Sequence, residues 1–257
     1  MLIVPTSRVR AFTRPIFDTL TTMTTPKKQR TQPQYELLYH PGIPGRGEYV
    51  RLAFEAAGAA YSDPANEKEG GYSIVQAACK PDSTGEDGNP PVFAPPALRV
   101  PGAGKDGKPL LISQTPNILL YLGPKLGLVS DDEAEKYYVN GLALTALDLS
   151  NEAHDTHHPV AVMKYYEGNS PCGFEKLPDF QLKIHYYHNH IFRTNKNAEQ
   201  KEEALKKSQD FRENRIPKFF SYFERVLKGN EAIGKGKYLV GDKLTYADTT
   251  FWQVVDG

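Results

Sequence analysis

The sequence predicts a small α/β domain that is followed by an all-helical domain. Short apolar runs bounded by glycine and proline, which are typical of strands, occur between Tyr35 and Ser113. A strand-to-helix corner, SQTPNILLYLGPKLG, then spans residues 113–127. Beyond Gly127 the strand signals nearly vanish and helical periodicity takes over. The order β-α-(β)-α-β-β-α favours a mixed, four-stranded sheet flanked by helices, with a helical region after it.

The expected elements of the first domain follow one another closely. The run YELLYH at residues 35–40 predicts a strand, because it is apolar and is followed by Pro41, Gly42 and Pro44. The remaining elements are an amphipathic helix at 46–58, a weaker helix at 73–78, a polar loop at 80–91, and strands at 96–101 and 110–113.

The corner at residues 113–127 has the features of a capped helix. Thr115 is expected to be its N-cap, Pro116 its first helical residue and Gly127 its C-cap. The start of such a helix presents unpaired backbone N–H groups at the positive end of the dipole, which suits a carboxylate or a phosphate. Gln114 and the Thr115 hydroxyl would add side-chain hydrogen bonds. An ordinary capped helix after a strand explains the same residues.

The second domain is expected to begin with a linker near residues 128–132. Ser130 is expected to cap a long helix over residues 131–153. A second helical segment covers residues 194–229, where a charged run precedes an apolar one and Pro217 is expected to kink or restart the helix. The stretch at 154–193, rich in aromatic residues and histidine, has no assigned secondary structure.

Composition narrows the functional classes. Of the 257 residues, Lys and Arg together number 31 and so do Asp and Glu, so the formal net charge is zero. This balance gives no support to nucleic acid or an anionic membrane as a partner. No apolar run is long enough to span a bilayer. Cys79 and Cys172 form neither a disulfide framework nor a metal pattern and are expected to be free thiols in a reducing compartment.

The first 33 residues differ from the rest. They contain six Arg and Lys residues, many threonines, and Asp18 as the single acidic residue. This composition is typical of a mitochondrial presequence. Four prolines interrupt any long amphipathic helix, which favours the alternative of a disordered leader, or of an upstream extension before a start at Met23.

From Tyr35 to Gly257 the chain resembles the cytosolic glutathione transferase family, in particular its tyrosine-type members of a fungal, sigma or pi kind. Four segments carry the resemblance: YELLYHPGIPGRGEYVRLAFEAAG, FAPPALRV, SQTPNILLYLGPKLGL and YLVGDKLTYADTTFW. They resemble, in order, the family's first strand and helix, its cis-proline segment, its glutathione-binding corner and its helix-capping box. In the box, Thr245 and Asp248 would be reciprocal caps. The resemblance implies a thioredoxin-like domain at residues 34–127 and a helical domain at 128–257.

The resemblance also implies a site. Tyr39 occupies the position of the catalytic tyrosine, although the loop that follows it is one residue longer than in tyrosine-type relatives. A hydroxyl or amide from elsewhere, as in serine-type relatives, therefore remains an alternative. Residues implied to bind glutathione are Arg46, Pro95, Pro96, Gln114, Thr115 and Asp148, the last across a dimer interface. Either Pro96 or Pro95 would be the cis residue. Asp148 can equally be an exposed helical acid.

Two features remain outside this site. The histidines of HDTHHP, at positions 154, 157 and 158, lack a strong metal-ligand pattern, so no metal is expected and they fit a pocket lining or a helix end. The chain also stops soon after the capping box, so the resemblance implies a truncated C-terminus and an exposed apolar patch around Trp252.

The resemblance implies a glutathione transferase that conjugates the glutathione thiolate to a hydrophobic electrophile, with glutathione as co-substrate and no further cofactor. A homodimer in the cytoplasm is expected, or a mitochondrial location if residues 1–33 are a presequence. The alternatives are glutathione-dependent peroxidase or isomerase activity and a non-catalytic module that binds small molecules or proteins.

Overall fold

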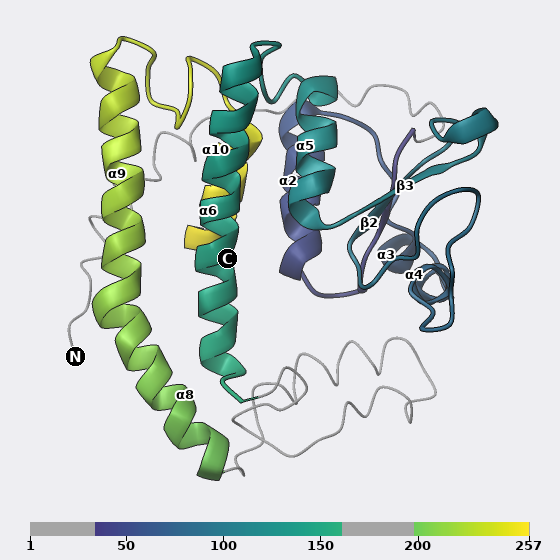
Figure 1. Ribbon diagram of the computed structural model, residues 1–257, viewed down its shortest axis with the longest axis horizontal. Helices are drawn as coiled ribbons and strands as arrows, with labels where there is room; N and C mark the ends of the chain where they lie inside the picture. Colours follow the sequence, from purple (N-terminus) through teal and green to yellow (C-terminus); the bar gives the residue numbers. More distant parts are fainter. Residues whose placement is uncertain (1–33, 161–197, 257) are drawn as a thin grey trace. The chain divides into compact units, whose positions relative to one another are not determined.

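The computed structural model describes residues 34–160 and 198–256 (Figure 1). Their contacts separate two compact units. One unit contains the described residues up to Ala146 and from Leu227 onward, and the other contains those from Leu147 to Val226. The expected leader at 1–33, Cys172 and most of the histidine-rich stretch lie outside the described residues. The predicted domain boundary at residues 127–128 stays a prediction.

The first unit contains an antiparallel sheet of three strands: β1 (Glu36–Leu38), β2 (Ala97–Val100) and β3 (Leu110–Ser113). Leu37 lies opposite Leu98, which lies opposite Ile112. The expected fourth strand is reduced to one parallel bridge between Glu36 and Ser62. It cannot extend further along the chain because Pro64 begins a helix two residues later.

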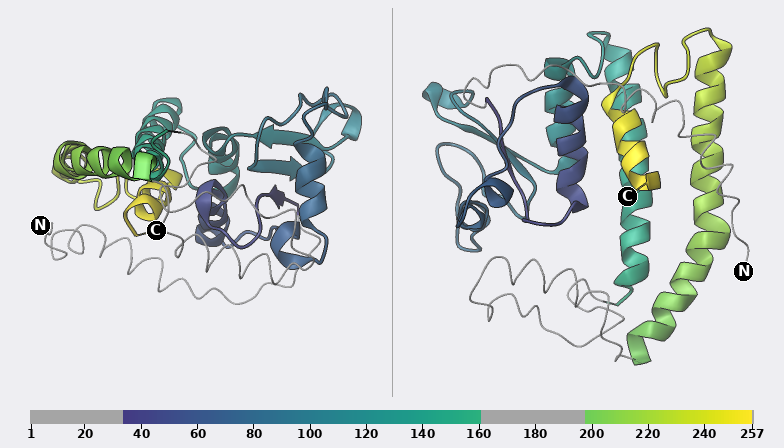
Figure 2. Two further views of the ribbon diagram at one scale, coloured as in Figure 1. Left: turned by 90° about the horizontal axis from the view of Figure 1, so that it is seen from below. Right: turned by 180° about the vertical axis from the view of Figure 1, so that it is seen from behind.

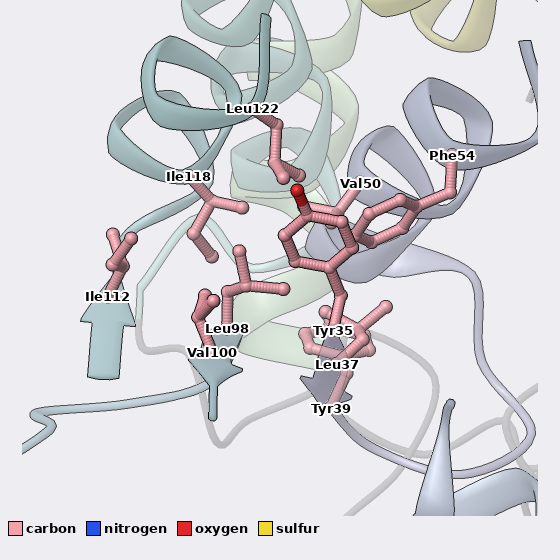
Figure 3. Close-up of a cluster of buried hydrophobic side chains, with 10 residues drawn as sticks. All are labelled: Tyr35, Leu37, Tyr39, Val50, Phe54, Leu98, Val100, Ile112, Ile118 and Leu122. Carbon is pink, nitrogen blue, oxygen red and sulfur yellow. The ribbon is translucent and has the colours of Figure 1, made fainter. Parts of the chain in front are cut away.

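Helices cover both faces of this sheet, as Figure 2 shows. On one face lie α2 (Gly45–Ala57) and α5 (Thr115–Leu126), and on the other lie α3 (Pro64–Glu67) and α4 (Tyr72–Ala78). Side chains of alternate residues in and beside β1 pack on opposite faces of the sheet, as expected for a strand. Tyr35, Leu37 and Tyr39 join the larger core with α2 and α5 (Figure 3), whereas Leu38 joins the core with α3 and α4.

The α5 helix begins one residue earlier than expected. Thr115 is its first residue and Gln114 precedes it, so the predicted N-cap role of Thr115 is wrong. The first helical hydrogen bond runs from the Ile118 N–H to the Gln114 carbonyl, at 2.9 Å. Gly127 ends the helix in the left-handed conformation, with φ of 70°, as predicted.

The long helix α6 (Glu133–His157) also has a different cap from the expected one. Asp132 Oδ1 accepts the N–H of Glu135 at 2.8 Å, so Asp132 satisfies the first turn. The Ser130 hydroxyl instead accepts the Asp132 N–H at 3.3 Å. The predicted cap was wrong because an aspartate two residues later competes for the same N–H groups.

The second helical segment is interrupted where the sequence suggested. The α8 helix (Ala198–Asp210) passes into a π-helical turn, η3 (Phe211–Arg215), and then into α9 (Ile216–Ala232). Pro217 is the second residue after this turn, at the second position of α9. Its missing N–H and its ring are incompatible with a regular preceding turn, which explains the local change of helix type. Arg215 forms a two-pronged ion pair with Glu152, at 2.7 and 2.6 Å.

The last helix, α10 (Tyr246–Asp256), returns to the first unit and packs against α2. The Asp248 carboxylate is completely buried and accepts three hydrogen bonds. Oδ1 accepts the Leu239 N–H at 2.8 Å, and Oδ2 accepts the Thr245 N–H at 2.8 Å and the Thr245 hydroxyl at 2.7 Å. Half of the expected reciprocal capping is therefore present, because the Thr245 hydroxyl bonds the carboxylate rather than the Asp248 N–H.

Candidate functional site

Tyr39 lies directly after β1, with its ring against the start of α2. Its hydroxyl oxygen accepts the backbone N–H of Arg46 at 2.8 Å, and the residue is only 5% exposed. Two glycines make this position possible. A Cβ on Gly45 would collide with the Tyr39 hydroxyl, and a Cβ on Gly47 would lie 2.5 Å from the ring. The motif GRG therefore provides both a cradle for the ring and an N–H for its hydroxyl.

The surroundings keep the Tyr39 hydroxyl protonated near neutral pH. Burial raises the pKa of Tyr39 above its ordinary value, and the Arg46 N–H together with the charges of Arg46 and Arg51 offsets part of that rise. The Arg51 guanidinium carbon lies 5.7 Å from the centre of the ring. Because the oxygen accepts the bond from Arg46, the hydroxyl proton is available to a second group. Tyr39 can therefore act as a hydrogen-bond donor.

The corner between β3 and α5 combines one exposed and one buried residue. Gln114 is exposed and has φ of 73° and ψ of 122°, a region that residues other than glycine rarely adopt. Thr115 is 1% exposed, and its hydroxyl donates to the Arg46 carbonyl at 3.0 Å. The Thr115 hydroxyl therefore ties the start of α5 to the start of α2.

The backbone of Arg46 connects Tyr39 to the corner between β3 and α5. The N–H of this residue bonds the Tyr39 hydroxyl and its carbonyl accepts the Thr115 hydroxyl. Arg46, which the sequence indicated as a glutathione contact, is thus placed between the candidate catalytic tyrosine and the strand-to-helix corner. Tyr39, Arg46, Gln114 and Thr115 are brought together in one local structure.

The backbone conformation at Pro95 and Pro96 shows which of the two prolines follows a cis peptide bond. The Pro95–Pro96 peptide bond is cis, and β2 begins at the next residue, Ala97. Pro96 is therefore the residue that follows the cis bond, which was one of the two alternatives. Pro95 has no backbone N–H to offer to a ligand.

The remaining candidates lie on α6. Asp148 is exposed and belongs to the second unit, so its expected contact with glutathione stays a prediction. The rings of His154 and His158 stack 4.5 Å apart near the end of the helix, and His154 Nδ1 lies 3.5 Å from Asp155 Oδ1. Within residues 34–160 and 198–256, no group of three or more His, Cys, Asp or Glu side chains is arranged to hold a metal. In the same ranges, no helix is both long and apolar enough to cross a membrane.

Three residues near Tyr39 were not predicted from the sequence. Arg51, Asp63 and Asn66 form a hydrogen-bonded cluster beside the loop that follows Tyr39. One signal was present, because Arg51 is a charged residue between two apolar residues, Val50 and Leu52, in the sequence of its helix. A charged residue in that position needs buried partners.

The backbone of Gln114 leads to a first prediction. Replacing Gln114 by glycine is expected to raise the free energy of unfolding by about 1 kcal/mol, because glycine adopts a positive φ without steric cost. Urea denaturation of the purified full chain measures this change. As a control, the same substitution at the exposed Gln76 of α4 is expected to lower that free energy by about 1 kcal/mol. A loss of stability in both variants would contradict the expectation.

Comparison with known proteins finds similarity to glutathione transferases in the C-terminal sequence and in the fold. Residues 185–257 match the family model described as the glutathione S-transferase C-terminal domain. The sigma-class glutathione transferase of Fasciola hepatica aligns with a TM-score of 0.52 and 18% identity, over 86% of this chain and 77% of that one. The pi-class enzyme of Onchocerca volvulus aligns with a TM-score of 0.51 and 19% identity, over 87% and 76%.

Residues 185–257 are similar to the C-terminal domain of glutathione transferases, and the chain shares the fold of solved members of that family. No curated protein matches it. The fold class predicted from the sequence is confirmed, since a small sheet with helices on both faces is followed by helices. At these identities the solved glutathione transferases establish the fold alone.

Proposed function

We propose that this chain is a glutathione transferase that binds glutathione, activates its thiol through Tyr39 and conjugates it to hydrophobic electrophiles. The observation that carries the proposal is the position of Arg46, which bonds the Tyr39 hydroxyl through its N–H and the Thr115 hydroxyl through its carbonyl. A hydrogen-bond donor for sulfur and a helix N-terminus for a carboxylate are thereby held in a fixed relation.

The chemistry requires a thiolate near neutral pH. A free thiol has a pKa of about 8.5, so only a minor fraction is ionised there. A hydrogen bond from the Tyr39 hydroxyl to the sulfur would stabilise the anion by roughly 1.5–3 kcal/mol, which lowers the thiol pKa by about 1–2 units. The proton leaves to solvent. The thiolate then forms a carbon–sulfur bond with the electrophile, and the leaving group departs with its electron pair.

The glutathione backbone would be held on both sides of the sulfur. Its γ-glutamyl carboxylate fits the N-terminus of α5, where the exposed Gln114 side chain can add a hydrogen bond. The Thr115 hydroxyl already donates to Arg46, so we assign that side chain a role in shaping the corner. The cysteinyl part would lie against the backbone beside Pro96 as a short added strand.

This division of roles gives a second prediction. Gln114→Ala is expected to weaken glutathione binding about fivefold, the effect of one lost hydrogen bond, with little change in kcat. Thr115→Val is expected to weaken binding and also to lower the free energy of unfolding by about 1 kcal/mol, because the Arg46 carbonyl loses its donor. Calorimetric titration with glutathione measures the affinity. Wild-type affinity in both variants would show that the corner does not bind the tripeptide.

The proposal also includes a cytoplasmic homodimer that acts in detoxification, in which Asp148 of a second copy would contact the glutathione amine. Asp148→Asn is then expected to raise the glutathione KM without changing kcat. An unchanged KM would remove Asp148 from the site and leave the role of Tyr39 intact.

Two assays on the full chain test the main proposal. Calorimetry with glutathione is expected to show saturable binding, and chlorodinitrobenzene is expected to be conjugated faster than in the absence of protein. Binding without conjugation of this or other aromatic and alkyl electrophiles would favour a non-catalytic binding module. Absence of glutathione binding would contradict the proposal altogether.

A further inference from the structure

The loop that follows Tyr39, residues 40–45, is fixed by side chains outside it. The Gly42 N–H donates to Asn66 Oδ1 at 2.9 Å. The carbonyl oxygens of Ile43 and Pro44 each lie 3.4 Å from Arg51 Nη1. The loop leads into Gly45 and Arg46 at the start of α2. The Arg46 N–H bonds the Tyr39 hydroxyl, and a Cβ on Gly45 would collide with that oxygen. Its position therefore controls the surroundings of that hydroxyl.

The side chains that hold the loop are bonded to one another. Asp63 Oδ2 accepts both Arg51 Nε and Asn66 Nδ2, each at 2.8 Å. Arg51 Nη1 also bonds Glu48 Oε2 at 2.8 Å. The side chains of Arg51 and Asp63 are only 13% and 7% exposed. Each member of the cluster thus restricts the rotamers of the others.

The cluster is expected to add little to the free energy of unfolding, because it buries charged groups whose hydrogen bonds are incomplete. Arg51 Nη2 and Asp63 Oδ1 are buried, and neither has a hydrogen-bond partner among the residues that the structure describes. Burying a charged pair with atoms left unsatisfied offsets much of its attraction. What the cluster supplies is geometry, since its bonds connect the loop, α2 and α3, and Arg51 lies beside the Tyr39 ring.

We propose that Arg51, Asp63 and Asn66 are positioning residues that hold the loop at residues 40–45 and thereby set how strongly Tyr39 activates the glutathione thiol. The inference rests on the proposed function. The cluster acts through the hydrogen bond between the Arg46 N–H and the Tyr39 hydroxyl. It also acts through the Arg51 guanidinium beside the Tyr39 ring. A loop displacement of about 1 Å is enough to lower a rate strongly when it misaligns a reacting group.

Asn66→Ala is the informative variant, because Asn66 is exposed and its replacement leaves both core clusters intact. We expect kcat/KM for conjugation of chlorodinitrobenzene to fall about threefold to tenfold at mildly acidic pH, where the thiolate fraction limits the rate. The acid limb of the pH–rate profile is expected to shift upward by about half a unit to one unit, while calorimetric glutathione affinity is unchanged. Glu67→Ala, at the next residue of α3, which is also exposed, is the control and should behave as wild type.

A double-mutant cycle with Tyr39→Phe separates the possible results. If the cluster acts through Tyr39, Asn66→Ala lowers the rate in the wild-type background and has no further effect on Tyr39→Phe. Equal losses in both backgrounds, or no shift of the pH profile in Asn66→Ala, would overturn the inference while the role of Tyr39 stands. If Tyr39→Phe itself behaves as wild type, the proposed function of Tyr39 fails and the inference fails with it.

Discussion

Replacing Asp248 by alanine is expected to lower the free energy of unfolding by about 3 kcal/mol. The carboxylate is completely buried and is the acceptor for three donors, which come from Leu239 and Thr245. Its removal leaves buried N–H groups without an acceptor at the start of α10. Urea denaturation of the full chain measures the loss. Asp242→Ala, an exposed aspartate in the loop before α10, is the control and should change stability by less than about 0.5 kcal/mol.

The same carboxyl predicts a pH dependence of stability. Burial raises the pKa of Asp248 to about 6, whereas an aspartate in an unfolded chain has a pKa of about 3.9. Between these values the folded chain binds the proton that the unfolded chain releases. The stabilising contribution is therefore complete below about pH 4 and is lost as the pH rises through about 6. From about pH 5 to 7 the wild type should lose about 1 kcal/mol more than Asp248→Asn. Parallel curves for the two proteins would contradict this account.

The Tyr39→Phe variant is expected to conjugate about ten- to a hundredfold more slowly, with little loss of glutathione binding. Phenylalanine retains the packing of the ring between Gly45 and Gly47 but removes the proton that would bond the sulfur. Steady-state kinetics with saturating glutathione measures the change. Tyr35→Phe is the matched control, because it removes a hydroxyl from the same face at the other end of β1. Equal losses in the two variants would point to a general packing effect.

Elements with strong local signals were predicted well. The strand at residues 110–113 and the glycine that ends α5 were located correctly, because periodicity and a C-cap glycine are local properties of the chain. The caps were less predictable. Thr115 has the chemistry of an N-cap, yet its hydroxyl bonds the Arg46 carbonyl, which is 69 residues away along the chain. Such a competing acceptor is visible only once the helices are packed.

In the candidate site, too, residues with local sequence signals were predicted and residues that depend on tertiary contacts were not. Tyr39 and the cis-proline segment were indicated by their place in the strand pattern and by the family resemblance. The Arg51, Asp63 and Asn66 cluster was not, because its bonds depend on how the loop at residues 40–45 meets α3. The bond from Gly42 to Asn66 joins residues 24 positions apart. The longer loop after Tyr39 left a hydroxyl or amide from elsewhere as an alternative activating group. In the structure the Tyr39 hydroxyl accepts the Arg46 N–H, and the identity of the activating group stays a prediction.

The account depends most on the claim that Tyr39 lowers the pKa of bound glutathione. A pH titration of the ultraviolet absorbance of the thiolate, in the presence of saturating glutathione, measures this pKa directly in the full chain. The wild type is expected to give a pKa about 1–2 units below that of free glutathione, and Tyr39→Phe a pKa close to the free value. A wild-type pKa equal to that of free glutathione, or an equally lowered pKa in Tyr39→Phe, would contradict the claim.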